Sequence, residues 1–98
     1  MKFDTSYYAI SNDSDPVIMQ VMLACHTTRR YVNLVEEEFK CLIIWQDDGK
    51  DHREGEFIAF DGWRNIFKTL SEAMLAKHWL LEVPGRSLYN YDKPQYVF

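Results

Sequence analysis

The fold is decided by one stretch of the chain, Phe39-Lys40-Cys41-Leu42-Ile43-Ile44-Trp45, which has the clearest β-strand pattern in the 98 residues. Its odd-numbered positions are all apolar, and Leu42 and Ile44 make the other face apolar at the centre. A strand that is apolar on both faces lies inside a sheet that is covered on each side. We therefore expect a central strand over about residues 39–46.

The segment after this strand predicts a hairpin. Asp47-Asp48-Gly49-Lys50 follows it, and an Asp-Gly pair is a strong hairpin-turn signal. Residues 56–60 are the expected returning strand. A two-residue turn would place Trp45 opposite His52 and Ile43 opposite Glu54, which mixes apolar with charged partners. A looser acidic loop from 47 to 56 is equally compatible with the sequence.

Helical spacing is clearest after this hairpin. Apolar side chains recur there at intervals of three and four, at Trp63, Ile66, Phe67, Leu70, Ala73 and Met74. Such spacing is typical of an amphipathic helix with one face on the core. The pattern predicts a helix over about residues 62–80, ended by Pro84-Gly85.

Residues 16–28 allow two interpretations. The segment is apolar nearly all round from Val17 to Cys25, so it is either a deeply buried helix or a strand. Asp15-Pro16 is a good helix start, because Asp accepts hydrogen bonds from the first free N–H groups and Pro is favoured at the first helical position. This start signal favours the helix.

These elements predict an α+β fold in a single domain spanning residues 1–98. We expect a small antiparallel sheet, built on strands 39–46 and 56–60, packed against helices at 16–28 and 62–80. Residues 3–10 are expected to form a further short strand. Residues 85–98 form an aromatic C-terminal tail that is too apolar to stay in solvent.

Composition limits the classes of function. Fifteen acidic residues against eleven Lys and Arg give a net charge of −4, whereas phosphate-binding proteins usually carry a clustered positive charge. Direct binding of nucleic acid is therefore disfavoured, and a basic protein partner is favoured by charge complementarity. Aromatic residues make up 15% of the chain, more than one small core needs, so some are expected in a recognition surface.

The sequence also bears on the compartment. The first residues contain no apolar signal-peptide core, and no stretch approaches 18 uninterrupted apolar residues. Cys25 and Cys41 lie inside apolar runs, where free cysteine behaves as a small hydrophobic residue. We therefore expect a cytoplasmic protein with reduced thiols and no membrane segment.

Catalytic patterns are weak. The three histidines are far apart, the four glycines are scattered, and the acids of the 47–56 loop are out of step with a calcium-binding loop. A nucleophile formed by Cys41 with a histidine is the one enzymatic alternative that the sequence leaves. We expect a protein that is not an enzyme and holds no metal or cofactor.

Two features suggest a binding surface. One is the clustering of acidic residues on both sides of the central strand, where they are expected to converge at one end of the sheet. The other is the set of rings in the tail and on the last helix, since Tyr and Trp are common interface anchors. The candidate partner-binding residues are Glu36, Glu37, Glu38, Asp47, Asp48, Asp51, Glu54, Trp79, Tyr89, Tyr91, Tyr96 and Phe98.

Small size, acidity and aromatic content together fit the general character of phage or mobile-element proteins that block one host or defence enzyme. The first hypothesis is therefore an inhibitor that binds a basic nucleic-acid-processing enzyme. An immunity protein or antitoxin that neutralises a toxin nuclease is one alternative. A self-associating structural component, with the tail as its interface, is another.

Overall fold

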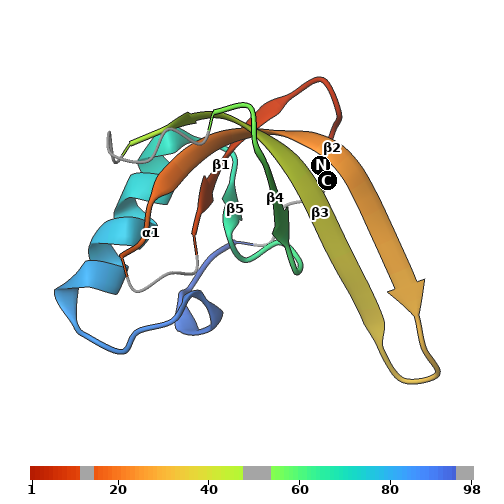
Figure 1. Cartoon of the computed structure of the whole chain (residues 1–98). Helices are drawn as coiled ribbons and strands as arrows, with labels where there is room; N and C mark the ends of the chain where they lie inside the picture. The colour runs from red at the N-terminus through yellow and green to blue at the C-terminus, as the bar shows by residue number, and fades with distance from the viewer. Residues whose placement is uncertain (12–14, 48–53, 95–98) are drawn as a thin grey trace.

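The computed structural model describes residues 1–11, 15–47 and 54–94 (Figure 1). The described residues form a five-stranded antiparallel sheet and one α-helix. The strands are β1 (Ser6–Ile10), β2 (Ile18–Arg30), β3 (Val35–Gln46), β4 (Phe57–Phe60) and β5 (Ile66–Phe67), and the helices are α1 (Leu70–Glu82) and the short 3₁₀ helix η1 (Leu88–Asn90).

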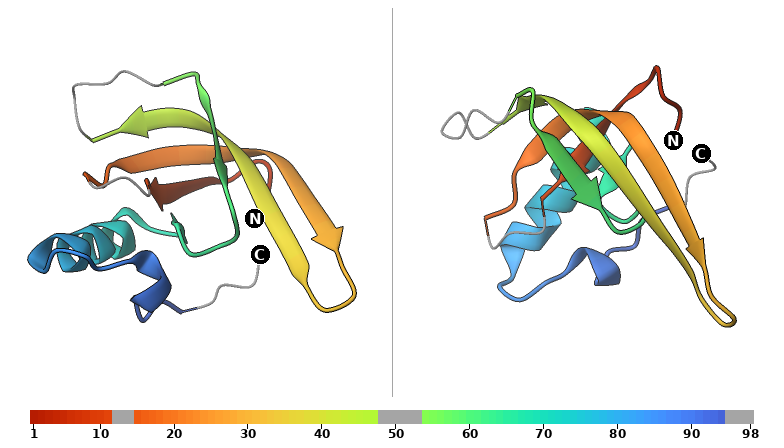
Figure 2. Two further views of the ribbon diagram at one scale, coloured as in Figure 1. Left: turned by 60° about the horizontal axis from the view of Figure 1, so that its bottom comes forward. Right: turned by 45° about the vertical axis from the view of Figure 1, so that its right-hand side comes forward.

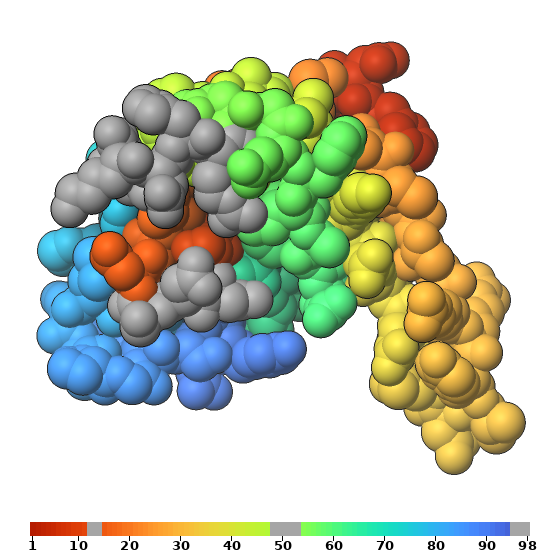
Figure 3. All heavy atoms as spheres, in the orientation of Figure 1, coloured from red at the N-terminus to blue at the C-terminus, as the bar shows by residue number. Residues whose placement is uncertain are grey.

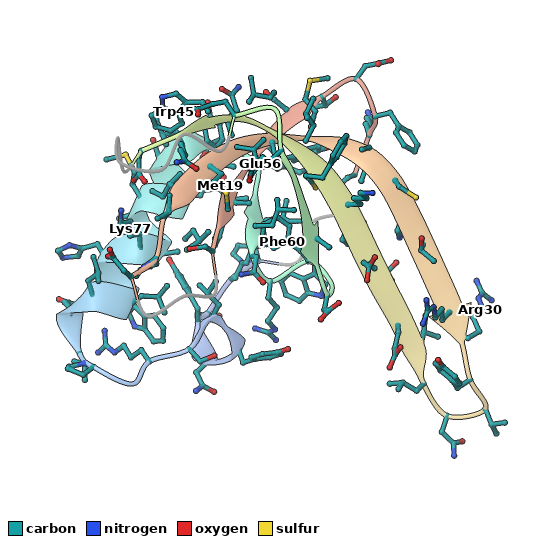
Figure 4. The ribbon with its side chains drawn as sticks, in the orientation of Figure 1. Met19, Arg30, Trp45, Glu56, Phe60 and Lys77 are labelled. Carbon is teal, nitrogen blue, oxygen red and sulfur yellow. The ribbon has the colours of Figure 1, made fainter. Side chains whose placement is uncertain are left out.

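The strands follow the order β4-β3-β2-β1-β5, and every neighbouring pair is antiparallel. The sheet curls, so that Phe60 of β4 and Ile66 of β5 share one buried cluster although they lie on opposite edges. Figure 4 shows Met19 and Phe60 on this enclosed side of the sheet.

Two clusters of buried side chains occupy the two faces of the sheet. Along β1, Tyr7 and Ala9 belong to the enclosed cluster, whereas Ile10 is buried in the cluster against α1 and Tyr8 packs on that cluster. Helix α1 contacts β1, β5 and the start of β2, and so covers only part of its face. Its fully buried residues are Ala73 and Ala76, whose small side chains let the helix lie close to the sheet.

The expected sheet packed against two helices is wrong, because residues 16–28 do not form a helix. Most of this segment is β2, which pairs with β1 on one side and β3 on the other. Asp15-Pro16 does not start a helix: the N–H of Val17 donates to Oγ of Ser11 at 2.9 Å, and that of Ile18 to Oδ1 of Asp47 at 3.0 Å. The segment is apolar all round because both faces of the sheet are covered where β2 begins.

The second expected helix starts at Leu70, seven residues after Trp63, the first apolar position of its expected pattern. Helix α1 begins after Thr69, whose Oγ1 accepts the N–H of Glu72 at 3.2 Å and donates to the Glu72 carboxylate at 3.2 Å. The spacing Thr-x-x-Glu is that of a capping box, and the bond from the Glu72 N–H to Oγ1 of Thr69 is one of the two hydrogen bonds of that motif. Ile66 and Phe67 precede it as β5, so their helical spacing with Leu70 is accidental.

The central strand and its expected hairpin partner pair with each other, and their register is that of the longer loop and not that of the two-residue turn. Leu42 lies opposite Phe57, and the N–H of Ile43 donates to the carbonyl of Glu56 at 2.9 Å. The two-residue turn, which would put Ile43 opposite Glu54, is therefore wrong. The expected turn at 48–50 itself lies outside the described residues.

Candidate functional site

A two-stranded arm leaves the body at the end opposite to α1 (Figures 1 and 2). It comprises residues 24–38, the outer halves of β2 and β3 with their connecting turn, and every one of these residues is exposed. The arm forms because the neighbouring strands stop early. The last pair of β1 with β2 is Ser6 with Met22, and that of β4 with β3 is Phe60 with Phe39.

The base of the arm is fixed to the enclosed cluster by ring stacking. His26 pairs with Phe39 across the strands, and their ring centroids lie 4.5 Å apart at 20°. Nε2 of His26 is also 3.4 Å from Oε1 of Glu37, and Phe39 is only 1% exposed. An isolated hairpin is marginal in water, so these contacts at the base are needed to hold the arm in one orientation.

The end of the arm is apolar. Val32 is 99% exposed, and its neighbours in the turn are more than half exposed. We call this set, Tyr31, Val32, Leu34 and Val35, the arm tip. Single exposed apolar residues are common on protein surfaces, but a contiguous group of them marks an interaction site. Val32 contributes almost no burial to the fold of the chain itself, and the other three residues of the arm tip are each more than half exposed.

A groove of about 580 Å³ separates the arm from the body. The space-filling view shows the arm standing away from the body with this hollow between them (Figure 3). The arm contributes most of its lining, and Asp61, Gly62 and Tyr89 line the side of the body. Gly62 adopts a positive φ of 95° where the chain turns away after β4.

The groove is acidic with apolar patches. Its arm side contains Thr27, Arg29, Leu34, Val35, Glu36, Glu37 and Glu38. With Asp61, the lining carries four carboxylates against one guanidinium, so a positively charged segment is the complementary occupant. Tyr89 presents an exposed ring, 75% accessible, on the body side of the groove.

Among the described residues, the two acidic clusters predicted from the sequence do not meet. Glu36, Glu37 and Glu38 lie on the arm, whereas Asp47 follows the other end of β3, about 30 Å away along the strand. Asp47 instead binds groups of its own chain, the N–H of Ile18 and Nζ of Lys77, each at 3.0 Å. Asp47 therefore does not join the three glutamates at one end of the sheet, as had been expected.

The predicted aromatic residues also separate. Trp79 and Tyr91 pack against each other with ring centroids 5.2 Å apart, and Arg86 lies 4.6 Å over the Trp79 ring. Both rings are half-buried on the helix side, away from the groove. Tyr89 is the predicted ring that lines the groove with the three glutamates. Glu54 is exposed just before β4, and Asp48, Asp51, Tyr96 and Phe98 lie outside the described residues.

Sequence reasoning missed the arm tip and Asp61. One signal was available: Arg29 and Glu36 are placed symmetrically about Val32-Asn33, and opposite charges are favourable in facing positions of a hairpin. In the structure Arg29 does lie opposite Glu36. Residues 27–30 and 36–38 are polar at both odd and even positions, which indicates a ribbon with water on both faces.

The surroundings of Cys41 do not favour its hypothetical role as a nucleophile. Cys41 is buried in the enclosed cluster, and burial raises the pKa of its thiol to about 11. The thiol is therefore protonated at neutral pH, whereas a nucleophile must be a thiolate. Cys25 is exposed on the arm, with its sulfur 3.8 Å from Oγ1 of Thr27.

Lys93 is an unusual buried cation near the C-terminal end of the described chain. The residue is 8% exposed, and its Nζ lies 4.7 Å from the ring centroid of Trp63 and 4.9 Å from that of Phe67. The pKa of Lys93 is lowered to about 8, chiefly by loss of hydration; the Glu72 carboxylate opposes this shift and the Arg64 guanidinium adds to it.

A second exposed apolar surface lies on the outer side of α1. It consists of Leu70, Met74, Leu75 and Leu81, which are 37–66% exposed. A smaller hollow of about 220 Å³, lined by Leu75 with Phe67 and Tyr91 among others, adjoins it. The hollow is also lined by Glu72 and Lys93, which are opposite in charge, so it lacks the predominance of one sign that the groove offers for recognition.

Comparison with known proteins gives no family or relative: no protein-family profile, no curated protein and no solved structure matches the chain. Among the described residues, no helix is both long and apolar enough to cross a membrane. The same part of the chain brings no three His, Cys, Asp or Glu side chains together in an arrangement that would hold a metal ion.

Proposed function

We propose that this protein is a non-enzymatic binding protein, and that the arm and its groove hold a protein partner with a basic surface. The observation that supports it most is the arm tip, a group of apolar side chains that are 54–99% exposed and project from the body. Removing apolar surface from water is favourable, so exposed apolar groups of this kind are stabilised when an interface buries them.

Charge supports the class of partner. The groove lining carries four carboxylates against one guanidinium, and such a surface steers a basic partner toward it. Enzymes that process nucleic acids carry basic surfaces that bind phosphates. An inhibitor that fills such a surface, encoded by a phage or mobile element, is therefore the favoured version of the proposal. An immunity protein or antitoxin directed at a nuclease toxin would use the same chemistry.

Self-association is the competing function, and the unpaired edges of the arm are the observation that favours it. Beyond Met22 and Phe39, β2 and β3 pair only with each other among the described residues. Exposed edges are templates for pairing between chains. Light scattering over a hundredfold range of protein concentration separates the two: a constant monomer mass contradicts self-association.

The binding proposal is tested with three variants of the tagged protein. Val32→Asp changes the arm tip, Glu36→Gln/Glu38→Gln neutralises the groove, and Asp15→Asn/Glu82→Gln is the matched control. The control makes the same change in net charge on exposed residues that do not line the groove. Because Val32 is 99% exposed, its substitution is not expected to affect folding.

A partner identified by affinity capture from the host cell is then purified, and its binding and enzymatic activity are measured with each variant. We expect Val32→Asp to abolish capture and inhibition. We expect the groove variant to slow association about threefold to tenfold at low salt, with the control unchanged. Equal binding of all three variants would contradict the arm as the binding site.

A further inference from the structure

The outer part of β3 is an open sheet edge beside the groove. Strand β4 pairs with β3 only from Leu42 to Phe39, and the chain turns away at Asp61 and Gly62. Among the described residues, no strand pairs with β3 at 35–38 on the side of β4. The groove borders this edge, because residues 34–38 line it on consecutive positions, and it also extends over the face of the arm that carries Thr27 and Arg29.

The direction of the backbone groups at this edge follows from the hydrogen bonds of β3. The N–H and carbonyl of Ile43 both bond toward β4, to Glu56 and Gly55 at 2.9 and 2.8 Å. Backbone groups alternate in direction along a strand, and β3 pairs with β4 without a register shift. Alternate residues from Ile43 toward the arm tip therefore point the same way, which places the N–H and carbonyl of Glu37 and Val35 on the open edge.

The hairpin turn independently supports this assignment of the backbone groups of β3 to the two edges. The N–H of Tyr31 donates to the carbonyl of Leu34 at 2.7 Å, so Leu34 bonds toward β2. Glu36 and Glu38 then also bond toward β2, opposite Arg29 and Thr27.

We infer that the β3 edge from Val35 to Glu38 binds an extended, lysine- or arginine-rich segment of the partner as an additional strand of the sheet. This inference rests on the proposed function and specifies how the partner is held. The backbone of Val35 and Glu37 supplies hydrogen bonds that need no particular partner sequence. The carboxylates of the groove select for positive charge in the added strand.

Charge decides between the candidate occupants. A second copy that docked through the same edge in antiparallel register would set glutamates against glutamates, which is unfavourable in facing positions. Residues 95–98 of this chain contain no Lys or Arg. A basic segment of another protein is the occupant that the groove complements.

The test uses a synthetic peptide of the composition Lys-Val-Lys-Thr-Lys-Val-Lys, acetylated and amidated, with the wild-type protein. Two control peptides separate the contributions: one has Glu in place of every Lys, and the other carries N-methyl groups on alternate backbone amides, which prevents edge pairing but keeps the charge. Binding is followed by NMR, together with hydrogen exchange of the amides of Val35 and Glu37.

We expect the basic peptide to bind and to slow exchange of the Val35 and Glu37 amides at least about tenfold. The N-methylated peptide is expected to bind about tenfold more weakly, and the acidic peptide not to bind. Equal binding of the basic and N-methylated peptides, absence of binding by both, or unchanged exchange at Val35 and Glu37 would each overturn strand addition. A protein that self-associates through this edge without peptide would overturn the choice of occupant.

A pair of protein variants gives a second, independent measurement. Glu37→Gln removes the charge but keeps the N–H, whereas Glu37→Pro removes both, and proline is tolerated on strand edges where the N–H faces outward. We expect Glu37→Pro to bind the basic peptide about tenfold more weakly than Glu37→Gln. Equal affinities would overturn the inference, whereas the proposed function fails only if Val32→Asp and the groove variant leave partner binding unchanged.

Discussion

Asp47 and Lys77 join the end of β3 to helix α1, with Nζ of Lys77 donating to Oδ2 of Asp47 at 3.0 Å (labelled Lys77 in Figure 4). The other carboxylate oxygen accepts the N–H of Ile18 at 3.0 Å, at the first residue of β2. One side chain thus links two strands and the helix. The sequence placed Asp47 in an acidic binding surface, but its hydrogen bonds assign it a role in holding the fold together.

We therefore expect Asp47→Ala to destabilise the protein by about 1–3 kcal/mol, because a backbone N–H and an ammonium group both lose their acceptor. Lys77→Met removes only the ion pair, at a partly exposed site, and is expected to change stability by less than about 1 kcal/mol. Urea unfolding followed by circular dichroism measures both. Equal effects of the two substitutions would show that the bond to Ile18 contributes nothing.

Lys93 makes stability depend on pH in the alkaline range. Burial lowers the pKa of Lys93 from 10.5 to about 8, so between these values the unfolded chain binds a proton that the folded chain does not. Stability from this group therefore rises with pH across that window, and the cost of burying the charge is fully present below it. We expect Lys93→Met to be stabilising at pH 7.

The advantage of Lys93→Met is expected to shrink by about 2 kcal/mol between pH 7 and pH 10, because the wild-type lysine becomes neutral. Unfolding of both proteins in urea at several pH values measures the difference, and other titrating groups cancel in it. A difference that stays constant with pH would mean that Lys93 remains charged in the folded protein.

The two cysteines are expected to react differently with thiol reagents. Cys25 is exposed on the arm, whereas Cys41 is buried and its pKa is raised to about 11. Native protein treated with iodoacetamide at pH 7.5 should gain one label, at Cys25, by peptide mass spectrometry. Cys41 should react only in denaturant, since a buried thiol is inert. Labelling of Cys41 before Cys25 would contradict this expectation and would support the hypothesis that Cys41 is a nucleophile.

How far the sequence predicts this fold depends on which faces of an element are covered. Along residues 39–45 the apolar pattern predicted the central strand, and β3 does run through them. Along β2, Ile18 and Met19 are buried in different clusters, so the alternation that identifies a strand disappears. Pro16, which also fits the start of a helix, then favoured the wrong interpretation.

Helix α1 shows the opposite difficulty. Its buried side is made of Ala73 and Ala76, while Met74 and Leu75 are exposed, so apolar spacing pointed to the wrong face and the wrong start. The local chemistry of Thr69 and Glu72 marks the start correctly. For the candidate site, Glu36 to Glu38 and Tyr89 were found from residue type, whereas Asp61 is brought to them only by the turn after Phe60.

The arm and its base are expected to differ sharply in their importance for folding. Phe39 is 1% exposed and stacks on His26, so Phe39→Ala should destabilise the protein by about 3–5 kcal/mol through the cavity that it leaves. Val32→Ala, at a residue that is 99% exposed, should change stability by less than about 0.5 kcal/mol. Thermal and urea unfolding of both variants measure the contrast. A large effect of Val32→Ala would mean that the arm tip packs against the protein's own body in solution, and the surface proposed for the partner would then already be occupied.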